Sequence, residues 1–165
     1  MDLKRFWHHI LMNPARESRC FPAATLDAIQ REIAAQEKLH RGEICFVVEA
    51  ELTSRELWHD VTSRDRAREV FALRGVWNTE ENNGTLIYLL LAERRVEIIA
   101  DRGIARHVHP GEWKAICHMM EGHFGQGRFE EGAIAGVRAA SELLARHFPP
   151  NGGKRNELPD RPALI

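Results

Sequence analysis

The stretch NNGTLIYLLLAERRVEIIADRGI, residues 82–104, decides the fold that this sequence predicts. Its two apolar runs, TLIYLLLA and VEIIA, are separated only by a charged turn centred on Arg94. A link this short cannot carry a crossover, so the two runs are predicted to form an antiparallel hairpin. The second run stops at Asp101, directly before an arginine and a glycine, which places an acidic side chain at the end of a strand.

A further strand is predicted upstream, in ICFVVEAEL at residues 44–52. This run begins with consecutive apolar and β-branched residues, as in a strand that is covered on both faces. Between it and the hairpin lies SRDRAREVFALRG, a predicted helix with Ser63 as its N-cap and Gly75 at its end. A strand, a helix and a strand in succession favour a right-handed parallel crossover, so the predicted sheet is mixed.

Helical spacing of apolar residues predicts helices on both sides of these strands. One helix follows Pro22 and is predicted to end at Gly42, another begins at Pro110, and the last runs from Arg128 to about His147. The predicted order is two helices, a strand, a helix, two strands and two helices. We therefore expect the α/β class, as a three-layer α/β/α sandwich with a small mixed β-sheet flanked by helices.

The sequence divides the chain into three parts. Residues 1–14 are predicted to form an amphipathic helix that Pro14 ends. Its apolar face either docks on the domain or lies on a membrane surface or a protein partner. Residues 21–148 form the α/β/α domain, and residues 149–165 are a Pro/Gly-rich tail that wraps the surface or stays mobile.

Composition excludes some classes of function. The 23 Lys and Arg residues are balanced by 24 Asp and Glu residues, so no net field steers a nucleic acid, and no nucleic-acid partner is expected. The three cysteines lack the spacing of a zinc or redox motif. No window reaches the roughly 18 apolar residues of a membrane span. No cleavage site follows the N-terminal segment, and we expect a cytoplasmic protein.

The predicted topology brings polar residues to one edge of the sheet, because the starts of the two parallel strands lie beside the end of the third. These residues are His40, Glu43, Asn82, Asn83, Asp101, Arg102, His107 and His109. Such a set is suited to a hard cation, which prefers oxygen ligands. It is equally suited to a phosphate, with an arginine as donor and a carboxylate or imidazole as acid/base. In the third interpretation the same residues only cap turns and pair with one another.

His107 and His109 stand two apart on an extended segment and could share a transition metal. We favour a simpler prediction, in which His109 caps the helix that begins at Pro110. Cys117 falls on the apolar stripe of that helix and His118 points elsewhere, so neither completes a zinc site. Signatures of serine hydrolases, nucleotide-binding loops and kinases are not found in the sequence.

The hairpin stretch resembles the core of the TPM-domain family, also labelled TPM phosphatase. In that pattern N-x-G opens a strand, a charged turn follows, and a D-R-G-I end leads into a helix. The likeness extends over HRGEICFVVEAEL, the Trp113 helix and the G-x-F-x-x-G start of the last helix, from Phe21 to Phe148. The chain departs from many members by having Phe21-Pro22 where they have an acidic pair, and we expect it to lack their signal peptide and C-terminal span.

The resemblance implies an α/β/α sandwich around a mixed sheet and a bacterial protein. It further implies a metal-associated site, with calcium in some members, and acid phosphatase activity of the kind reported for a plant thylakoid-lumen member. The metal ligands carry over onto Asn83, Asp101 and Glu43 of this sequence.

Two functions from different classes follow. We favour a non-catalytic binding or adaptor module that engages a protein partner or a membrane surface through the first helix and the NELPDRPALI tail. The alternative is a phosphatase-like hydrolase assisted by a divalent cation, calcium or magnesium, with weak acid-phosphatase activity. In the hydrolase Glu43, Asn83 and Asp101 would hold the cation. Asp101 and His107 would be the catalytic residues, with Arg102 and Asn82 on the phosphate.

Overall fold

The computed structural model describes residues 5, 9, 14–152 and 155–165. In chain order its elements are α2 (Pro14–Cys20), α3 (Ala23–Gln36), the 3-10 turn η1 (Glu37–Leu39), β1 (Glu43–Glu49), α4 (Ser54–Trp58), α5 (Ser63–Leu73), β2 (Gly84–Leu90), β3 (Arg95–Ala100), α6 (Arg102–Ala105), α7 (Pro110–Gly125), α8 (Phe129–His147) and β4 (Ala163–Leu164).

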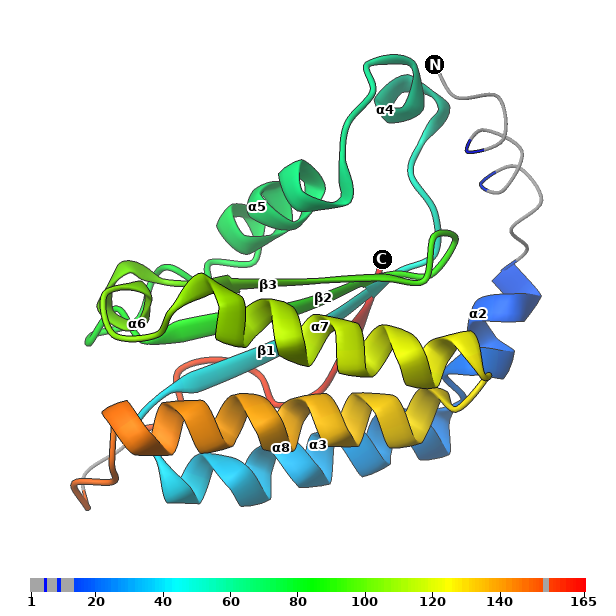
Figure 1. Ribbon diagram of the computed structural model, residues 1–165. Coiled ribbons are helices and arrows are strands. Elements are labelled where there is room, and N and C mark those ends of the chain that lie inside the picture. The colour runs from blue at the N-terminus through cyan, green and yellow to red at the C-terminus, as the bar shows by residue number, and fades with distance from the viewer. Residues whose placement is uncertain (1–4, 6–8, 10–13, 153–154) are drawn as a thin grey trace.

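The four strands form one mixed sheet in the order β3-β2-β1-β4. β1 and β2 are parallel, with Glu43 opposite Gly84, and β2 and β3 are antiparallel, with Thr85 opposite Ala100. The predicted hairpin and the predicted crossover are therefore both confirmed. The starts of β1 and β2 lie beside the end of β3, as the sequence predicted (Figure 1).

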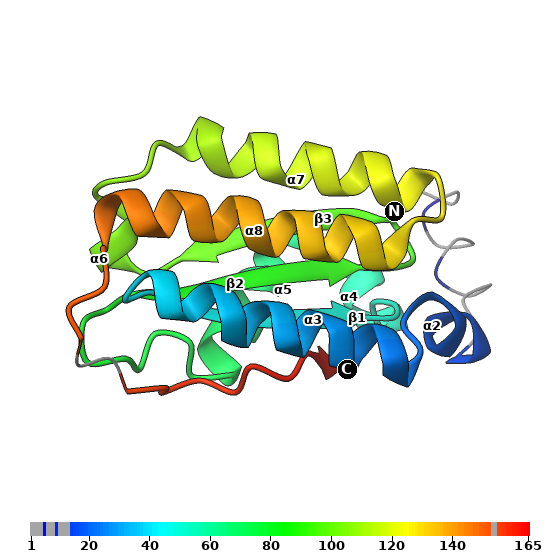
Figure 2. The ribbon, with the colours of Figure 1, turned by 90° about the horizontal axis from the view of Figure 1, so that it is seen from below.

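Helices cover the sheet on both faces, which confirms the three-layer α/β/α class. The long helices α3, α7 and α8 cover one face, and α5 lies on the other (Figures 1 and 2). Alternate residues of β1 enter two separate cores: Ile44, Phe46 and Val48 pack under the three long helices, whereas Cys45 and Val47 pack toward α5. Because both faces of β1 are buried in this way, its sequence from Ile44 to Val48 is continuously apolar.

Two helix boundaries differ from the prediction. α3 ends at Gln36 rather than at Gly42, because η1 follows and the Glu37 carboxylate turns back to accept the Ile44 N–H at 2.7 Å. The N-cap of α5 is Thr62 rather than Ser63. Thr62 accepts the Asp65 N–H, and the Ser63 hydroxyl instead donates to Glu97 on β3 at 2.8 Å.

The C-terminal tail contributes the fourth strand, which the sequence analysis did not predict. β4 pairs in parallel with β1, through Val47 opposite Ala163 and Val48 opposite Leu164. The Ile165 N–H donates to the Val48 carbonyl at 2.9 Å. The tail was predicted either to wrap the surface or to stay mobile. Residues 155–165 wrap the surface, where they follow the open edge of β1 (Figure 2).

The predicted N-terminal helix, residues 1–14, lies mostly outside the described residues. Pro14 begins α2 instead of merely ending the preceding pattern. Two residues of the segment contact the domain: Arg5 Nε donates to Glu93 at 2.7 Å, and the Leu52 N–H donates to His9 Nδ1 at 3.0 Å. Across the described part of the chain, no helix has the length and apolar character that crossing a membrane requires.

Candidate functional site

The predicted polar edge exists, and Gly84 lies at its centre. We call it the Gly84 rim, defined by Glu43 at the start of β1, Asn83 and Gly84 at the start of β2, and Asp101 after β3. The Asp101 N–H donates to the Gly84 carbonyl at 2.8 Å, and the Glu43 N–H donates to the Asn83 carbonyl at 3.1 Å. Main-chain hydrogen bonds thus hold the three strand ends together.

Asp101 is the N-cap of α6, which answers why an acidic residue ends β3. Its Oδ1 accepts the Arg102 N–H at 2.7 Å, while its carbonyl accepts the Ile104 and Ala105 N–H groups. The turn requires Gly103, because a side chain at this position would collide with the Asn82 carbonyl oxygen. The D-R-G sequence therefore encodes a tight strand-to-helix junction packed against the start of β2.

Glu43 is 1% exposed and binds the tail. Its Oε2 accepts the N–H groups of Glu157 and Leu158, at 3.3 and 3.1 Å. The Leu158 side chain is itself buried, in the core beneath α5. The predicted metal ligand therefore also anchors the segment that leads into β4, through two backbone N–H groups.

The two predicted phosphate-binding residues contact each other. Arg102 Nε donates to Asn82 Oδ1 at 3.0 Å, and Arg102 is exposed to solvent. Asn82 has a φ of 52°, a left-handed conformation that asparagine tolerates better than most residues, and its carbonyl accepts the Gly103 N–H. Asn82 therefore shapes the turn that faces α6.

Three buried side-chain oxygens close to Gly84 accept no hydrogen bond from the described residues: Asn83 Oδ1, Thr85 Oγ1 and Asp101 Oδ2. Asn83 Nδ2 donates to the Arg41 carbonyl at 2.5 Å, which fixes the amide with its oxygen left over. Buried acceptors without a donor each cost about 1–3 kcal/mol, so each of these oxygens is a candidate to bind a ligand.

The donor chemistry at the rim fits a hard cation better than a transition metal. The available ligands are carboxylate, amide and hydroxyl oxygens, which calcium and magnesium prefer. Within the described ranges no cluster of three or more His, Cys, Asp or Glu side chains could hold a metal ion. A cation here would therefore rely on Asp101, Glu43 and Asn83 together with main-chain carbonyls.

His107 packs against the end of α8 and the residue after it. Its ring stacks on His147 with a centroid distance of 6.2 Å and meets the edge of Phe148 at 5.6 Å. The predicted zinc alternative gains no support from His109, whose Nδ1 accepts the Gly111 N–H at 3.0 Å as the N-cap of α7. The helix-capping prediction for His109 is confirmed.

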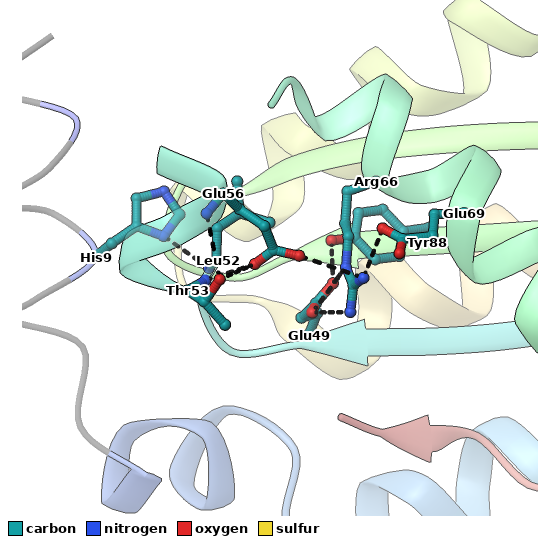
Figure 3. Close-up of polar contacts among 8 residues, drawn as sticks. All are labelled: His9, Glu49, Leu52, Thr53, Glu56, Arg66, Glu69 and Tyr88. Atoms are coloured by element: carbon teal, nitrogen blue, oxygen red, sulfur yellow. Dashed lines mark hydrogen bonds and ion pairs between the residues drawn. The ribbon is translucent and has the colours of Figure 1, made fainter. Parts of the chain in front are cut away.

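A second buried polar group, which the sequence analysis missed, lies at the opposite end of β1 (Figure 3). We call it the Glu49 cluster: Glu49, Glu56, Arg66, Glu69 and Tyr88. Arg66 donates from Nε and Nη2 to both oxygens of Glu49 at 2.8–3.0 Å, and the Tyr88 hydroxyl donates to Glu49 Oε2 at 2.5 Å. Arg66 Nη1 also reaches Glu69 at 2.8 Å and Glu56 at 3.3 Å.

The Glu49 cluster attaches α5 to the sheet and leaves no carboxylate oxygen of Glu49 free. Burial of Tyr88, with the Glu49 carboxylate beside it, raises the pKa of the phenol far above its usual range. The hydrogen bond to Glu49 likewise raises the pKa of Arg66, so the guanidinium stays charged. One signal could have found this cluster: the chain has a single tyrosine, and it lies in an otherwise apolar strand.

The fold and the Gly84 rim together define a small α/β/α domain with a polar site at the meeting point of three strand ends. A family profile described as the TPM domain matches residues 16–143. The chain belongs to the TPM domain family.

Two solved structures show the same architecture. The NMR structure of the BA42 protein from the psychrophilic bacterium Bizionia argentinensis has a TM-score of 0.73 and 30% sequence identity, over 87% of this chain and 94% of that one. The N-terminal domain of a protein from P. gingivalis has a TM-score of 0.61 and 26% identity, over 78% of this chain and 81% of that one. A search among curated proteins gave no match.

Proposed function

We propose that this protein is a non-catalytic binding module that takes a divalent cation, calcium or magnesium, at the Gly84 rim. The observation that carries the proposal is two buried oxygens without a donor, Asp101 Oδ2 and Asn83 Oδ1, from the residue that bonds to the Gly84 carbonyl and the residue that precedes Gly84. A cation would provide the partner that the surrounding protein does not. Asp101 supplies a negative charge, and Glu43 a second one at the neighbouring strand.

The non-catalytic part of the proposal is supported by the other partners of the predicted catalytic groups. The Arg102 guanidinium is engaged with Asn82, and the His107 ring packs on His147. Asp101 holds the start of α6 through its other oxygen. Each of these residues thus has a role in the fold, and a cation at the rim would fix the junction of β3 and α6 in place.

A thermal-melting experiment tests cation binding. A ligand that binds only the folded state stabilises it by about 2.7 kcal/mol at a hundredfold excess over Kd, so calcium or magnesium should raise the Tm measurably. Asp101→Asn keeps a good N-cap oxygen but removes the charge, and it should abolish the rise. Asp65→Asn removes an exposed carboxylate far from the rim on α5 and should leave the rise unchanged. An equal rise in Asp101→Asn and wild type would overturn the site.

Hydrolysis of p-nitrophenyl phosphate separates the module from the hydrolase. The proposal expects background turnover with calcium or magnesium present. Turnover that depends on the cation, and that both Asp101→Asn and His107→Ala remove, would establish the hydrolase instead of the non-catalytic module.

The adaptor role through residues 1–14, in the cytoplasm, stays a proposal. Two polar contacts support a docked position for this segment: Arg5 and His9 both bond to Glu93 at the β2–β3 turn, at 2.7 and 3.0 Å. A chain that lacks residues 1–12 should fold but lose recovery of a partner, or of vesicles that contain anionic lipid. Unchanged recovery would contradict this part.

A further inference from the structure

A groove of about 560 Å³ runs along the outer edge of β3, between α5 and α7. Figure 1 views the molecule from this side, with β3 in front, α5 above it and α7 below. Apolar side chains from β3, α7 and the loop before it line the groove: Val96, Ile98, Ala100, Val108, Trp113 and Cys117. Burial, followed by the nearby Glu97 and Glu121 carboxylates, raises the pKa of the Cys117 thiol to about 12, so this wall is neutral at ordinary pH.

The hydrogen-bond register of the sheet shows which main-chain groups face the groove. Asp101 bonds through its N–H to Gly84, so this pair is of the hydrogen-bonded kind. In an antiparallel ladder the two kinds of pair alternate, and Val96, Ile98 and Ala100 therefore direct their N–H and C=O groups away from β2. Edge groups of this kind are the template onto which another strand adds.

Three of these outward groups are bonded to side chains: the Ile98 N–H to the Cys117 thiol in the wall of the groove, and two others to side chains at its border. The Val96 N–H donates to Glu121 Oε1 at 3.0 Å, and Arg64 Nη1 donates to the Ile98 carbonyl at 2.6 Å. Glu121 thus accepts a hydrogen bond from the edge of β3 and Arg64 donates one to it, as the C=O and N–H groups of a neighbouring strand would. Glu121 belongs to α7 and Arg64 to α5, so an added strand would take over these two bonds as the side chains move aside.

The charge around the groove selects an acidic ligand. Arg64 and Arg95 protrude into solvent, with 46% and 54% of their side chains exposed, and Lys114 is also exposed at the border. The two carboxylates of the groove are recessed, at 18% exposure each, and both already have cationic partners, Arg64 for Glu97 and Arg95 for Glu121. An approaching chain therefore meets positive charge first.

The geometry points to β-strand addition: we propose that β3 and α7 bind an extended acidic segment of a partner protein, with its backbone on Val96, Ile98 and Ala100. Side chains of the added strand would alternate between the apolar wall at Trp113 and Cys117 and the arginines at the border. A second copy of this chain is a poor occupant, because its own β3 edge carries the same basic border, Arg64, Arg95 and Lys114, and no acidic segment. This inference rests on the role as a binding module and names the surface that does the binding.

The test uses the full chain, labelled with ¹⁵N, and a blocked peptide of three Glu-Val repeats. The expected result is saturable NMR shifts of the Val96, Ile98 and Ala100 amides. A Lys-Val peptide of the same length, and a Glu-Val peptide with N-methylated glutamates, should each bind at least about fivefold more weakly, because one reverses the charge and the other removes main-chain donors.

A matched pair of variants locates the charge effect. Arg95→Glu should lower the affinity for the Glu-Val peptide by about fivefold or more. Arg68→Glu should not, although Arg68 is as exposed as Arg95 and lies as close to an acidic neighbour, at 3.5 against 3.7 Å. Equal binding of the Lys-Val or N-methylated peptide, or no binding of any peptide, would overturn strand addition. Concentration-dependent shifts at Val96 without peptide would show a second copy in the groove, and would overturn it too.

The peptide and the cation are measured separately. If calcium raises the Tm but no peptide binds, the groove proposal is wrong and the cation proposal stands. If the peptide binds but no cation does, the rim proposal fails alone.

Discussion

Buried polar groups lie at both ends of β1, and their bonding differs. Glu49, at one end, has both carboxylate oxygens bonded by Arg66 and a further bond from Tyr88. At the other end, the Gly84 rim leaves Asp101 Oδ2 and Asn83 Oδ1 without a donor among the described residues. Both groups are buried and polar, and both lie where strands end. Burial of a carboxylate alone therefore does not mark a binding site, whereas unused bonding capacity does.

Of the substitutions in this comparison, one in the Glu49 cluster should lower the free energy of unfolding most. Arg66→Ala leaves Glu49 buried without its cation, and removing one partner of a buried pair costs about 3–5 kcal/mol. Arg68→Ala, on the same helix but 64% exposed, should change the free energy of unfolding by less than about 0.5 kcal/mol. Urea denaturation measures both. Similar small losses would show that the cluster is not what holds α5 on the sheet.

The attachment of the tail to the Gly84 rim should show the next largest effect. Leu158→Ala removes a side chain that is 8% exposed and should cost about 2–3 kcal/mol. Leu164→Ala, in the same tail but 39% exposed, should cost less than about 0.5 kcal/mol. Chemical denaturation would separate them. Equal costs would mean that the tail adds no core, and that Glu43 binds a segment of little consequence.

Asp101 should show a smaller effect on stability than on cation binding, which is where the two ends of β1 diverge. Asp101→Ala removes the N-cap oxygen of α6 and should cost about 1 kcal/mol, whereas Asp101→Asn should cost less than half of that. Both should remove the stabilisation by calcium. A loss of 3 kcal/mol or more, on the order expected for Arg66→Ala, would instead place Asp101 in the same structural class as Glu49.

Glu93 should show the smallest effect, and it depends on pH. Burial pushes the pKa of Glu93 up, but hydrogen bonds from His9 and Arg5 outweigh burial and hold the pKa below its ordinary value of 4.5. The stabilisation is therefore present above pH 4.5 and is lost as the pH falls through the lowered pKa. The free energy of unfolding of the wild type should exceed that of Glu93→Gln by up to about 1 kcal/mol at pH 7, and this difference should vanish in acid. A difference that is constant down to pH 2 would contradict the contact.

The sequence was sufficient for most of the fold because hydrophobic pattern and linker length determine it. The short charged turn around Arg94 permits only a hairpin, and the crossover rule then orients β1. Which strand ends are neighbours, the starts of β1 and β2 beside the end of β3, follows from those two steps. β4 escaped prediction because two residues in a Pro-rich tail carry no period, and only the free edge of β1 makes them a strand.

The rim could be located from the sequence, but the partners of its side chains could not. That Glu43 accepts N–H groups from the tail depends on a contact across 114 residues, which no local pattern encodes. The Glu49 cluster could not be predicted for a similar reason. In the sequence, Arg66 is one of several charged residues on an amphipathic helix, and nothing local marks Glu49 as its partner. The groove beside β3 depends on the phase of the hydrogen-bond ladder, and a hairpin pattern does not fix that phase.

The most direct test of the Gly84 rim is an NMR titration of the ¹⁵N-labelled chain with calcium. The account predicts saturable shifts of the Asn83 side-chain amide and of the Gly84 and Asp101 backbone amides. The Tyr88 amide should stay unchanged, and Asp101→Asn should abolish the shifts. Amides at the rim that do not move, or that move equally in Asp101→Asn, would contradict it.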